Sequence, residues 1–323
     1  MNVDEIKDVR DFRAGAPTPD RARLAEGRAR LTTAARGGRV HRLRADWRFA
    51  AVGAAAALTV VAVLAAGIGG DGADRSAPAD TRTVRGSVGE IMERAATAVE
   101  GDDPPATPRA GQWIYTKTLS RSPSGWPKGR AAPARQEPPQ ESWTLYADPR
   151  FENGKEGDDR SPRERLRFLN SLPDDPRAVL KRIRAYYPSD KANPESEGEH
   201  DMRAMTVVLE SRPMPPKALA TLYRALAAVP GAEVNRRLVR DAAGRDALAV
   251  GNDEKGQTVR REILIDPRTY QYLGDRWVVV KDYKESFAFT GDDTPDRPWK
   301  AGDLVFQDAL LETAVVDHKG DRP

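Results

Sequence analysis

Residues 257–283 read QTVRREILIDPRTYQYLGDRWVVVKDY, and this stretch decides the fold of the C-terminal part of the chain. Two runs rich in β-branched and aromatic residues, 257–265 and 270–283, predict strands. Asp266, Pro267 and Arg268 between them predict a tight turn. Strands joined by so short a connection are antiparallel. The stretch therefore predicts an antiparallel hairpin.

Further strands are expected on both sides of this hairpin. The same residue preferences, interrupted by turns at 241–244 and 252–256, predict strands at 112–119, 142–146, 233–240, 247–251 and 304–316. Residues 121–140 are expected to form a loop rich in proline, serine and arginine, and residues 188–200 a polar loop.

Apolar residues at helical spacing predict helices at 84–99, 162–170, 176–187, 202–209 and 215–229. Strands flank this helical block without βαβ alternation, which is typical of the α+β class. We therefore expect residues 84–323 to form one α+β domain, in which helices cover one face of a curved antiparallel sheet.

A membrane span is predicted at 49–68, which read FAAVGAAAALTVVAVLAAGI. These twenty uncharged residues make a helix about 30 Å long, the thickness of a bilayer core. A buried core helix and a cleaved signal peptide are the alternatives. The length of the run argues against the first, and the 48 residues that precede it argue against the second.

The residues around the span predict its orientation. Arginines, Arg44 and Arg48 among them, precede it, whereas aspartates dominate the linker at 69–83 that follows. Basic residues stay on the cytoplasmic side, so residues 1–48 are expected inside and 84–323 outside the cell membrane. Trp47 and Phe49 occupy the place of an interfacial aromatic anchor next to the lipid bilayer.

The segment 1–48 is too short for a core of its own but carries helical patterns. Ile6, Val9 and Phe12 recur every three residues, and Leu24 and Leu31 lie seven apart on one face. Such apolar stripes favour docking on a cytoplasmic partner. A frayed basic tail that only sets the topology is the alternative.

The composition excludes several classes of site. Lys+Arg is 52 against Asp+Glu 49, a balance that argues against binding of nucleic acid by the whole chain. The chain has no cysteine, and its three histidines, His41, His200 and His318, lie far apart. We therefore expect no cofactor and no metal site, and without a nucleophile–base motif we expect no enzyme.

Four weaker patterns favour ordinary structural roles. The acidic run around His200 is expected to be a solvated loop rather than a metal site. Adjacent aspartates are expected to cap helices or form turns. The arginines of 121–135 are expected to lie in a solvated loop rather than to bind cell-wall anions. Core packing rather than a ligand groove is expected for the aromatic residues Trp113, Tyr115, Trp143, Tyr146, Tyr270, Tyr272 and Trp277.

Several segments also resemble a known family. The residues that carry the resemblance are Asp8–Arg13, Gly111–Tyr115, Pro215–Val234, Arg240–Arg245, Glu262–Gly274, Ala301–Val305 and Ala314–Asp317. They resemble an uncharacterised family of single-pass membrane proteins from high-GC Gram-positive bacteria. Its members are often encoded beside extracytoplasmic-function sigma factors, which implies a sigma-regulating role. Because the chain has no cysteine, any contact with a sigma factor is expected to be metal-free.

The expected outer domain is also similar in architecture to lipoprotein-carrier and sigma-E-sensor domains. Two functions follow as hypotheses. The first is a membrane-anchored, non-enzymatic envelope sensor or regulator that acts on a sigma factor. The alternative is an extracytoplasmic carrier that binds a lipid, a lipoprotein or another apolar ligand between sheet and helices.

Overall fold

The computed structural model describes residues 83–123, 134–152, 160–189, 195–285 and 297–323. All of them belong to one compact unit, 74–323. None of the helices in these residues is long and apolar enough to cross a membrane, and the predicted span at 49–68 lies outside them.

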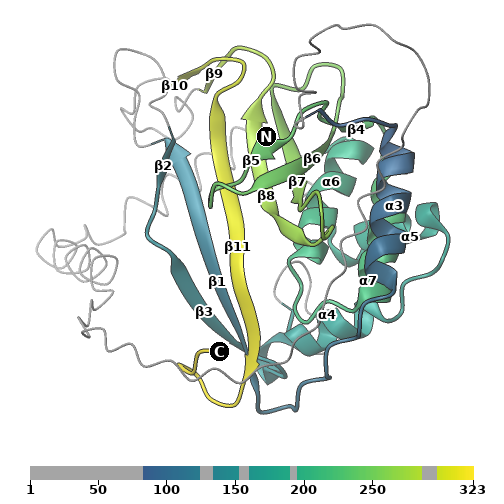
Figure 1. Ribbon diagram of the computed structural model, residues 1–323, viewed down its shortest axis with the longest axis vertical. Helices are drawn as coiled ribbons and strands as arrows, with labels where there is room; N and C mark the ends of the chain where they lie inside the picture. Colours follow the sequence, from purple (N-terminus) through teal and green to yellow (C-terminus); the bar gives the residue numbers. More distant parts are fainter. Residues whose placement is uncertain (1–82, 124–133, 153–159, 190–194, 286–296) are drawn as a thin grey trace, which may run out of the picture. The chain divides into compact units, whose positions relative to one another are not determined.

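The described residues form an α+β fold with five α-helices and a mostly antiparallel open sheet (Figure 1). In chain order the elements are α3 (Val88–Glu100), β1 (Trp113–Pro123), β2 (Ala134–Gln136), β3 (Gln140–Leu145), a 3₁₀ turn (Pro149–Phe151), α4 (Pro162–Leu169), α5 (Pro176–Tyr186), α6 (Glu197–Leu209), α7 (Pro216–Leu226), β4 (Ala232–Val234), β5 (Val239–Arg240), β6 (Asp246–Asn252), β7 (Val259–Ile265), β8 (Tyr272–Val279), β9 (Tyr283–Glu285), β10 (Arg297–Trp299) and β11 (Leu304–Val316).

The sheet runs in the order β2-β1-β11-β8-β7-β6-β4, with β3 on β1 and β5 on β6. The central hairpin β7–β8 is the one predicted from 257–283, and Ile263 lies opposite Asp275 in it. The last strand, β11, inserts between β8 and β1 and is antiparallel to both. A separate pair, β9 and β10, lies outside this sheet.

The main core lies where helices cover one face of β6 and β7. Leu248, Val250, Ile263 and Ile265 point toward α3, α5, α6 and α7 and join one buried cluster with residues of these helices. Alternate residues of the same strands, such as Ala249 and Leu264, pack into a second small cluster on the opposite face. This alternation confirms that β6 and β7 carry the four helices on one face.

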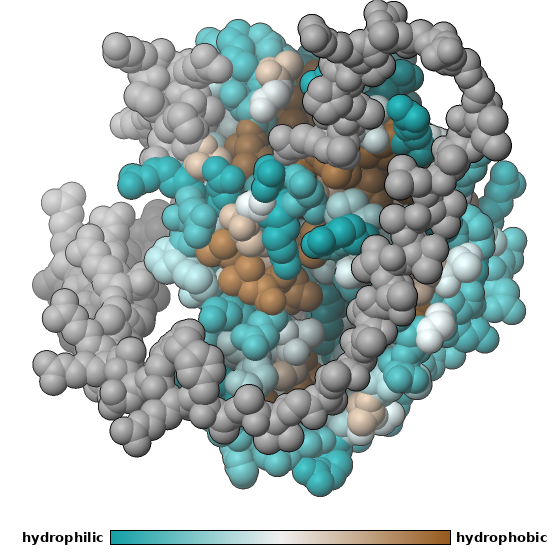
Figure 2. Space-filling view, in the orientation of Figure 1, coloured by the Kyte–Doolittle hydropathy of each residue, from teal (hydrophilic) through white to brown (hydrophobic). Residues whose placement is uncertain are grey.

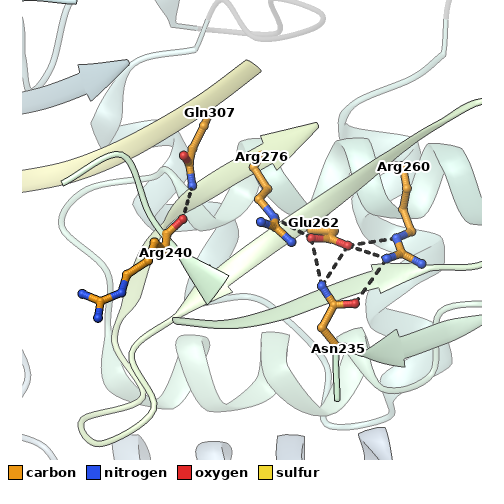
Figure 3. Close-up of polar contacts among 6 residues, drawn as sticks. All are labelled: Asn235, Arg240, Arg260, Glu262, Arg276 and Gln307. Carbon is orange, nitrogen blue, oxygen red and sulfur yellow. Dashed lines mark hydrogen bonds and ion pairs between the residues drawn. The ribbon is translucent and has the colours of Figure 1, made fainter. Parts of the chain in front are cut away.

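The helix-free face of the same strands holds a buried ion cluster (Figure 3). Glu262 lies between Arg260 and Arg276, with 2.6 Å from a carboxylate oxygen to each guanidinium. The side-chain amide of Asn235 also donates to Glu262. Because every partner is within hydrogen-bond distance, the carboxylate is fully paired although it is only 1% exposed.

Two strand predictions and one loop prediction need correction. The single strand expected at 233–240 is two short strands, because after Asn235 the chain leaves β6 and pairs with the segment before α3, where the carbonyl of Arg236 accepts from Val84 and Arg237 bridges to Thr83. The single strand expected at 270–283 is also two strands: β8 covers most of it, and β9 begins at Tyr283 in a separate sheet. The loop expected at 121–140 contains the end of β1 and all of β2.

The polar loop expected at 188–200 is also wrong at its end. Helix α6 begins at Glu197, because Ser196 and Glu199 form a reciprocal capping box. The hydroxyl of Ser196 accepts from the Glu199 amide at 3.1 Å, and the Ser196 amide donates to the Glu199 carboxylate at 3.0 Å. His200 therefore lies in the first turns of a helix and not in a solvated loop.

Candidate functional site

The residues that the sequence singled out for binding lie outside the described part of the chain. These are the predicted partner-binding residues Ile6, Val9, Phe12, Leu24 and Leu31, and the predicted membrane anchor Arg44, Trp47, Arg48 and Phe49. The structure bears on the predicted outer domain alone, and there it shows a cleft that the sequence did not indicate.

The cleft lies where β8 and β11 part and has a volume of about 520 Å³. The two strands pair from Leu304 opposite Val278 to Ala309 opposite Gly274, and β11 then continues alone on this side. In the space-filling view hydrophobic side chains surface over β11, with hydrophilic ones around them (Figure 2). The divergence of two neighbouring strands therefore leaves a cleft beside β11.

Gly274 sets the point of divergence. Its φ is +143°, and a Cβ built there would lie 2.1 Å from the carbonyl oxygen of Asp308. Only glycine lets the two backbones approach so closely at the last pair of the β8–β11 ladder. Just before it, Tyr270 adopts φ +56° in the β7–β8 turn, and its carbonyl accepts from the buried Tyr223 hydroxyl at 2.7 Å.

The walls of the cleft differ in chemistry. One wall is the run Leu310–Val315 of β11. The opposite wall comes from the connection between α3 and β1, from the segment after α6 and from α7, and it is mostly apolar. Its apolar members are Pro105, Pro213, Met214, Pro216 and Leu219.

Arg212 brings a positive charge into the cleft. Its Nη1 donates to the carbonyls of Leu209 and Ser211, both at 2.7 Å, and its guanidinium lies 5.5 Å from the centre of the Tyr272 ring. Among the described residues no carboxylate forms an ion pair with Arg212, and burial lowers its pKa. The remaining nitrogens are donors that an anionic ligand group would satisfy.

Other charges lie around the cleft. Asp102 and Asp103 follow α3, and Asp102 accepts from the side chain of Gln271 at 3.0 Å. Glu312 adds a third carboxylate from β11. Arg245 is the second cation, but it pairs with the buried Asp241 at 2.6 Å and donates to the carbonyl of Leu310. The rim therefore carries negative charge that the described residues do not fully balance.

A group of carboxylates lies on the helix-covered side of β8 and β11. Asp275 and Asp308 are cross-strand partners, and Glu210 follows α6. Burial, partly offset by Arg261 and by the Trp277 indole that donates at 3.0 Å, raises the pKa of Asp275 to about 6. Burial raises the pKa of Asp308 as well. Glu210 keeps contact with solvent, yet protein surrounds it on most sides, and this desolvation raises its pKa to about 7.

These carboxylates do not form a metal site. No group of three or more histidine, aspartate or glutamate residues in the described chain has the geometry to hold a metal ion. His200 Nε2 lies 2.7 Å from the carbonyl of Tyr187, and Asp201 pairs with Arg184 at 2.6 Å. The acidic run around His200 therefore stabilises the start of α6 and its contact with α5.

The other weak patterns have mixed outcomes. Asp175 caps α5 as expected, whereas Asp102 and Asp103 line the cleft. Arg121 lies on β1 and Arg135 on β2, while 124–133 between them fall outside the described residues. Tyr115 and Tyr146 are buried, as the core prediction requires. Trp113, Trp143, Tyr270 and Trp277 are only half-buried, and Tyr272 joins the core and also lines the cleft.

The sequence analysis missed Arg212 and the cleft edge of β11. The run Arg212-Pro-Met-Pro-Pro216 could have indicated this part of the cleft. Three prolines in five residues predict an irregular segment with a restricted backbone. The divergence of β8 from β11 had one local signal that the sequence analysis did not use, the isolated Gly274 within the predicted strand 270–283.

Comparisons with known proteins give no relative. Neither the family models nor the curated proteins nor the solved structures contain a match to this chain.

Proposed function

We propose that the chain is a membrane-anchored, non-enzymatic envelope sensor. In this proposal residues 49–68 span the cell membrane, residues 84–323 lie outside and bind a ligand in the cleft, and residues 1–48 engage a sigma factor in the cytoplasm. The cleft between β8 and β11 is the observation that carries the proposal. It places the guanidinium of Arg212, which has no ion-pair partner among the described residues, beside an exposed strand edge.

The packing under the helices supports a sensor over a carrier. A carrier for a lipid chain needs a deep apolar cavity between sheet and helices. Here Val250 and Ile263, the centre of that interface, are completely buried against helix side chains. The space left for a ligand lies at one end of the interface and contains Arg212 and carboxylates.

A carrier remains the second candidate because of one observation. The proline and leucine wall of the cleft, with Met214 in it, offers an apolar surface to a ligand. The test measures binding of a fatty acid by the whole chain. Binding that is weakened by Leu219→Glu, but not by Lys217→Glu on the exposed side of α7, would favour the carrier over the sensor.

The orientation is tested by proteolysis of intact protoplasts. Protease added outside should digest the chain after residue 71 and spare a tag at the N-terminus, because arginines precede the span. A protected C-terminus would overturn the proposal.

The cytoplasmic function is tested by crosslinking in the native host followed by mass spectrometry. The wild-type chain should recover a sigma factor, and the double variant Ile6→Asp with Phe12→Asp should lose it, because two carboxylates interrupt the apolar stripe. The matched control is Ala14→Asp with Thr18→Asp, which adds the same charge off the stripe. Equal recovery by all three chains would contradict a docking role for the stripe.

A further inference from the structure

The edge of β11 that faces the cleft can be assigned residue by residue. The carbonyl of Gln112 accepts from Tyr146 and that of Ser120 from Glu137, so the even-numbered backbone groups of β1 point toward β2 and β3. The odd-numbered groups of β1 then point toward β11. In an antiparallel ladder the N–H and C=O of a residue point the same way, and successive residues alternate.

The register between β1 and β11 extends this assignment of backbone directions to β11. Tyr115 lies opposite Ala314 and Trp113 opposite Val316, so Ala314 and Val316 point toward β1. Thr313 and Val315 consequently point the other way, into the cleft. Leu310 points the same way before the irregularity at Leu311, and the contact of its carbonyl with Arg245 at 2.9 Å agrees with this direction.

The lining of the cleft leads to the same conclusion. All six consecutive residues Leu310–Val315 line it, although neighbouring side chains of a strand point to opposite faces of the sheet. A cleft that touches all six therefore borders the edge of the strand, and where it reaches Ile114 of β1 it also extends over one face of β11. Beyond Ala309 no strand among the described residues pairs with this edge.

An open edge whose amides at Thr313 and Val315 have no strand partner within the described part of the chain is a template for another strand. The irregularity at Leu311 and the charge on Glu312 are devices that hinder flat edge-to-edge pairing with a second copy of the chain. The proline-rich wall opposite the edge lacks amide donors at three positions, so it contacts a ligand through van der Waals packing.

We infer that the cleft binds an extended peptide, which pairs as a strand with Thr313 and Val315 and places its C-terminal carboxylate against Arg212. The peptide's apolar side chains pack on the proline and leucine wall. Basic side chains on its other face meet Glu312 of β11 at the rim. This inference rests on the proposed function, since it names the chemical class of the ligand that the sensor would bind.

The probe is a synthetic hexapeptide of alternating lysine and valine that ends in valine with a free carboxylate. Its binding to the full chain in lipid nanodiscs is measured by fluorescence anisotropy of a dye on its N-terminus. The free acid should bind about tenfold more tightly than the same peptide with a C-terminal amide, because the amide loses the ion pair with Arg212. In Arg212→Gln the two peptides should bind equally.

Two N-methylated peptides test strand pairing. One carries methyl groups on the valine nitrogens and the other on the lysine nitrogens, so each blocks one of the two edges of the added strand. One of them should lose binding about tenfold and the other should keep it. Val315→Pro should weaken binding similarly while leaving the pairing with β1 intact, and Val315→Ala, which keeps the amide, is its control.

Several outcomes would overturn the inference. Equal binding of acid and amide would remove the role of Arg212, and equal effects of the two methylated peptides would exclude strand addition. So would the absence of saturable binding up to about 1 mM peptide. Self-association of the chain that Val315→Pro abolishes would assign the edge to a second copy. None of these measurements involves residues 1–48, so they can fail or succeed independently of a sigma-factor contact.

Discussion

In one half of the sheet, β6 and β7 are covered by four helices, and their inward side chains are completely buried. In the other half, Ile114 of β1 packs against Leu166 of α4, and β11 borders the cleft beyond Ala309. Both halves belong to the same hydrogen-bonded sheet. The difference teaches that the buried core of this domain forms where helices cover the sheet, whereas its cleft arises where β11 extends beyond the end of its pairing with β8.

The largest effect is expected for Val250→Asp in the covered half. Val250 is 0% exposed among helix side chains, so the aspartate would bury an unpaired charge. We expect a loss of roughly 4 kcal/mol or more in the free energy of unfolding, measured by denaturant titration of the full chain. A loss below about 1 kcal/mol would mean that the helices do not hold this half together.

Glu262→Ala should come next, because it leaves Arg260 and Arg276 without their shared carboxylate. Breaking a buried ion pair in this way costs about 3–5 kcal/mol. Asp317→Ala is the control in the open half, where the partner Arg109 is exposed and the expected loss is below about 1 kcal/mol. Equal losses of unfolding free energy in denaturant titrations of the two variants would contradict the proposed difference between the halves.

Asp275 lies on β8, where the two halves meet, and should make stability depend on pH. Its pKa is raised to about 6, so the folded state holds a proton that the unfolded state has released. The stabilisation is complete below about pH 4 and is lost as the pH rises through about 6. Asp275→Asn should remove it, and the wild-type minus variant difference in unfolding free energy should fall by about 2 kcal/mol between pH 4 and 7.

Glu210 and Asp308, which face Asp275 together with Arg261, would produce a residual slope of the same sign in the variant. A difference that rises with pH, or that does not change, would contradict the assigned direction.

The smallest effect is expected for Val315→Asp in the open half. Val315 is 39% exposed on the cleft edge, so its replacement buries no charge, and the unfolding free energy should change by less than about 0.5 kcal/mol. Together with Val250→Asp it forms a matched pair, the same substitution in strands of the two halves. A cost close to that of Val250→Asp would show that the cleft edge is covered in the native protein.

Much of the α+β architecture could be predicted from local patterns. The strand at 304–316 and the helix from 215 were placed closely, because their apolar spacing is regular over many residues. The start of α6 was missed although Ser196 and Glu199 carry a visible capping signal. The break between β4 and β5 could not be predicted, because it depends on the pairing of Arg236 and Arg237 with Val84 and Thr83, which are distant in sequence.

The cleft escaped prediction for a similar reason. Each of its walls has a sequence signal, such as the prolines after Arg212, but the space between them depends on how far β8 follows β11. Local propensity does not determine where two strands distant in sequence separate. The predictions for residues 1–68 stay predictions, since the described residues begin at Thr83.

The pairing of β1 with β11 also affects the order in which the domain folds. Trp113 pairs with Val316, so β1 cannot form this pairing until β11, about 200 residues later in the chain, has been made. Contacts between such distant residues form late and slowly. On a chain emerging from the ribosome, the helices and the β6–β8 meander can assemble first, while β1, with β3 on its other edge, stays without β11 until that strand has been made. A chain that stops before Leu304 would leave these strands available for aggregation, so loss of residues 304–323 should be damaging.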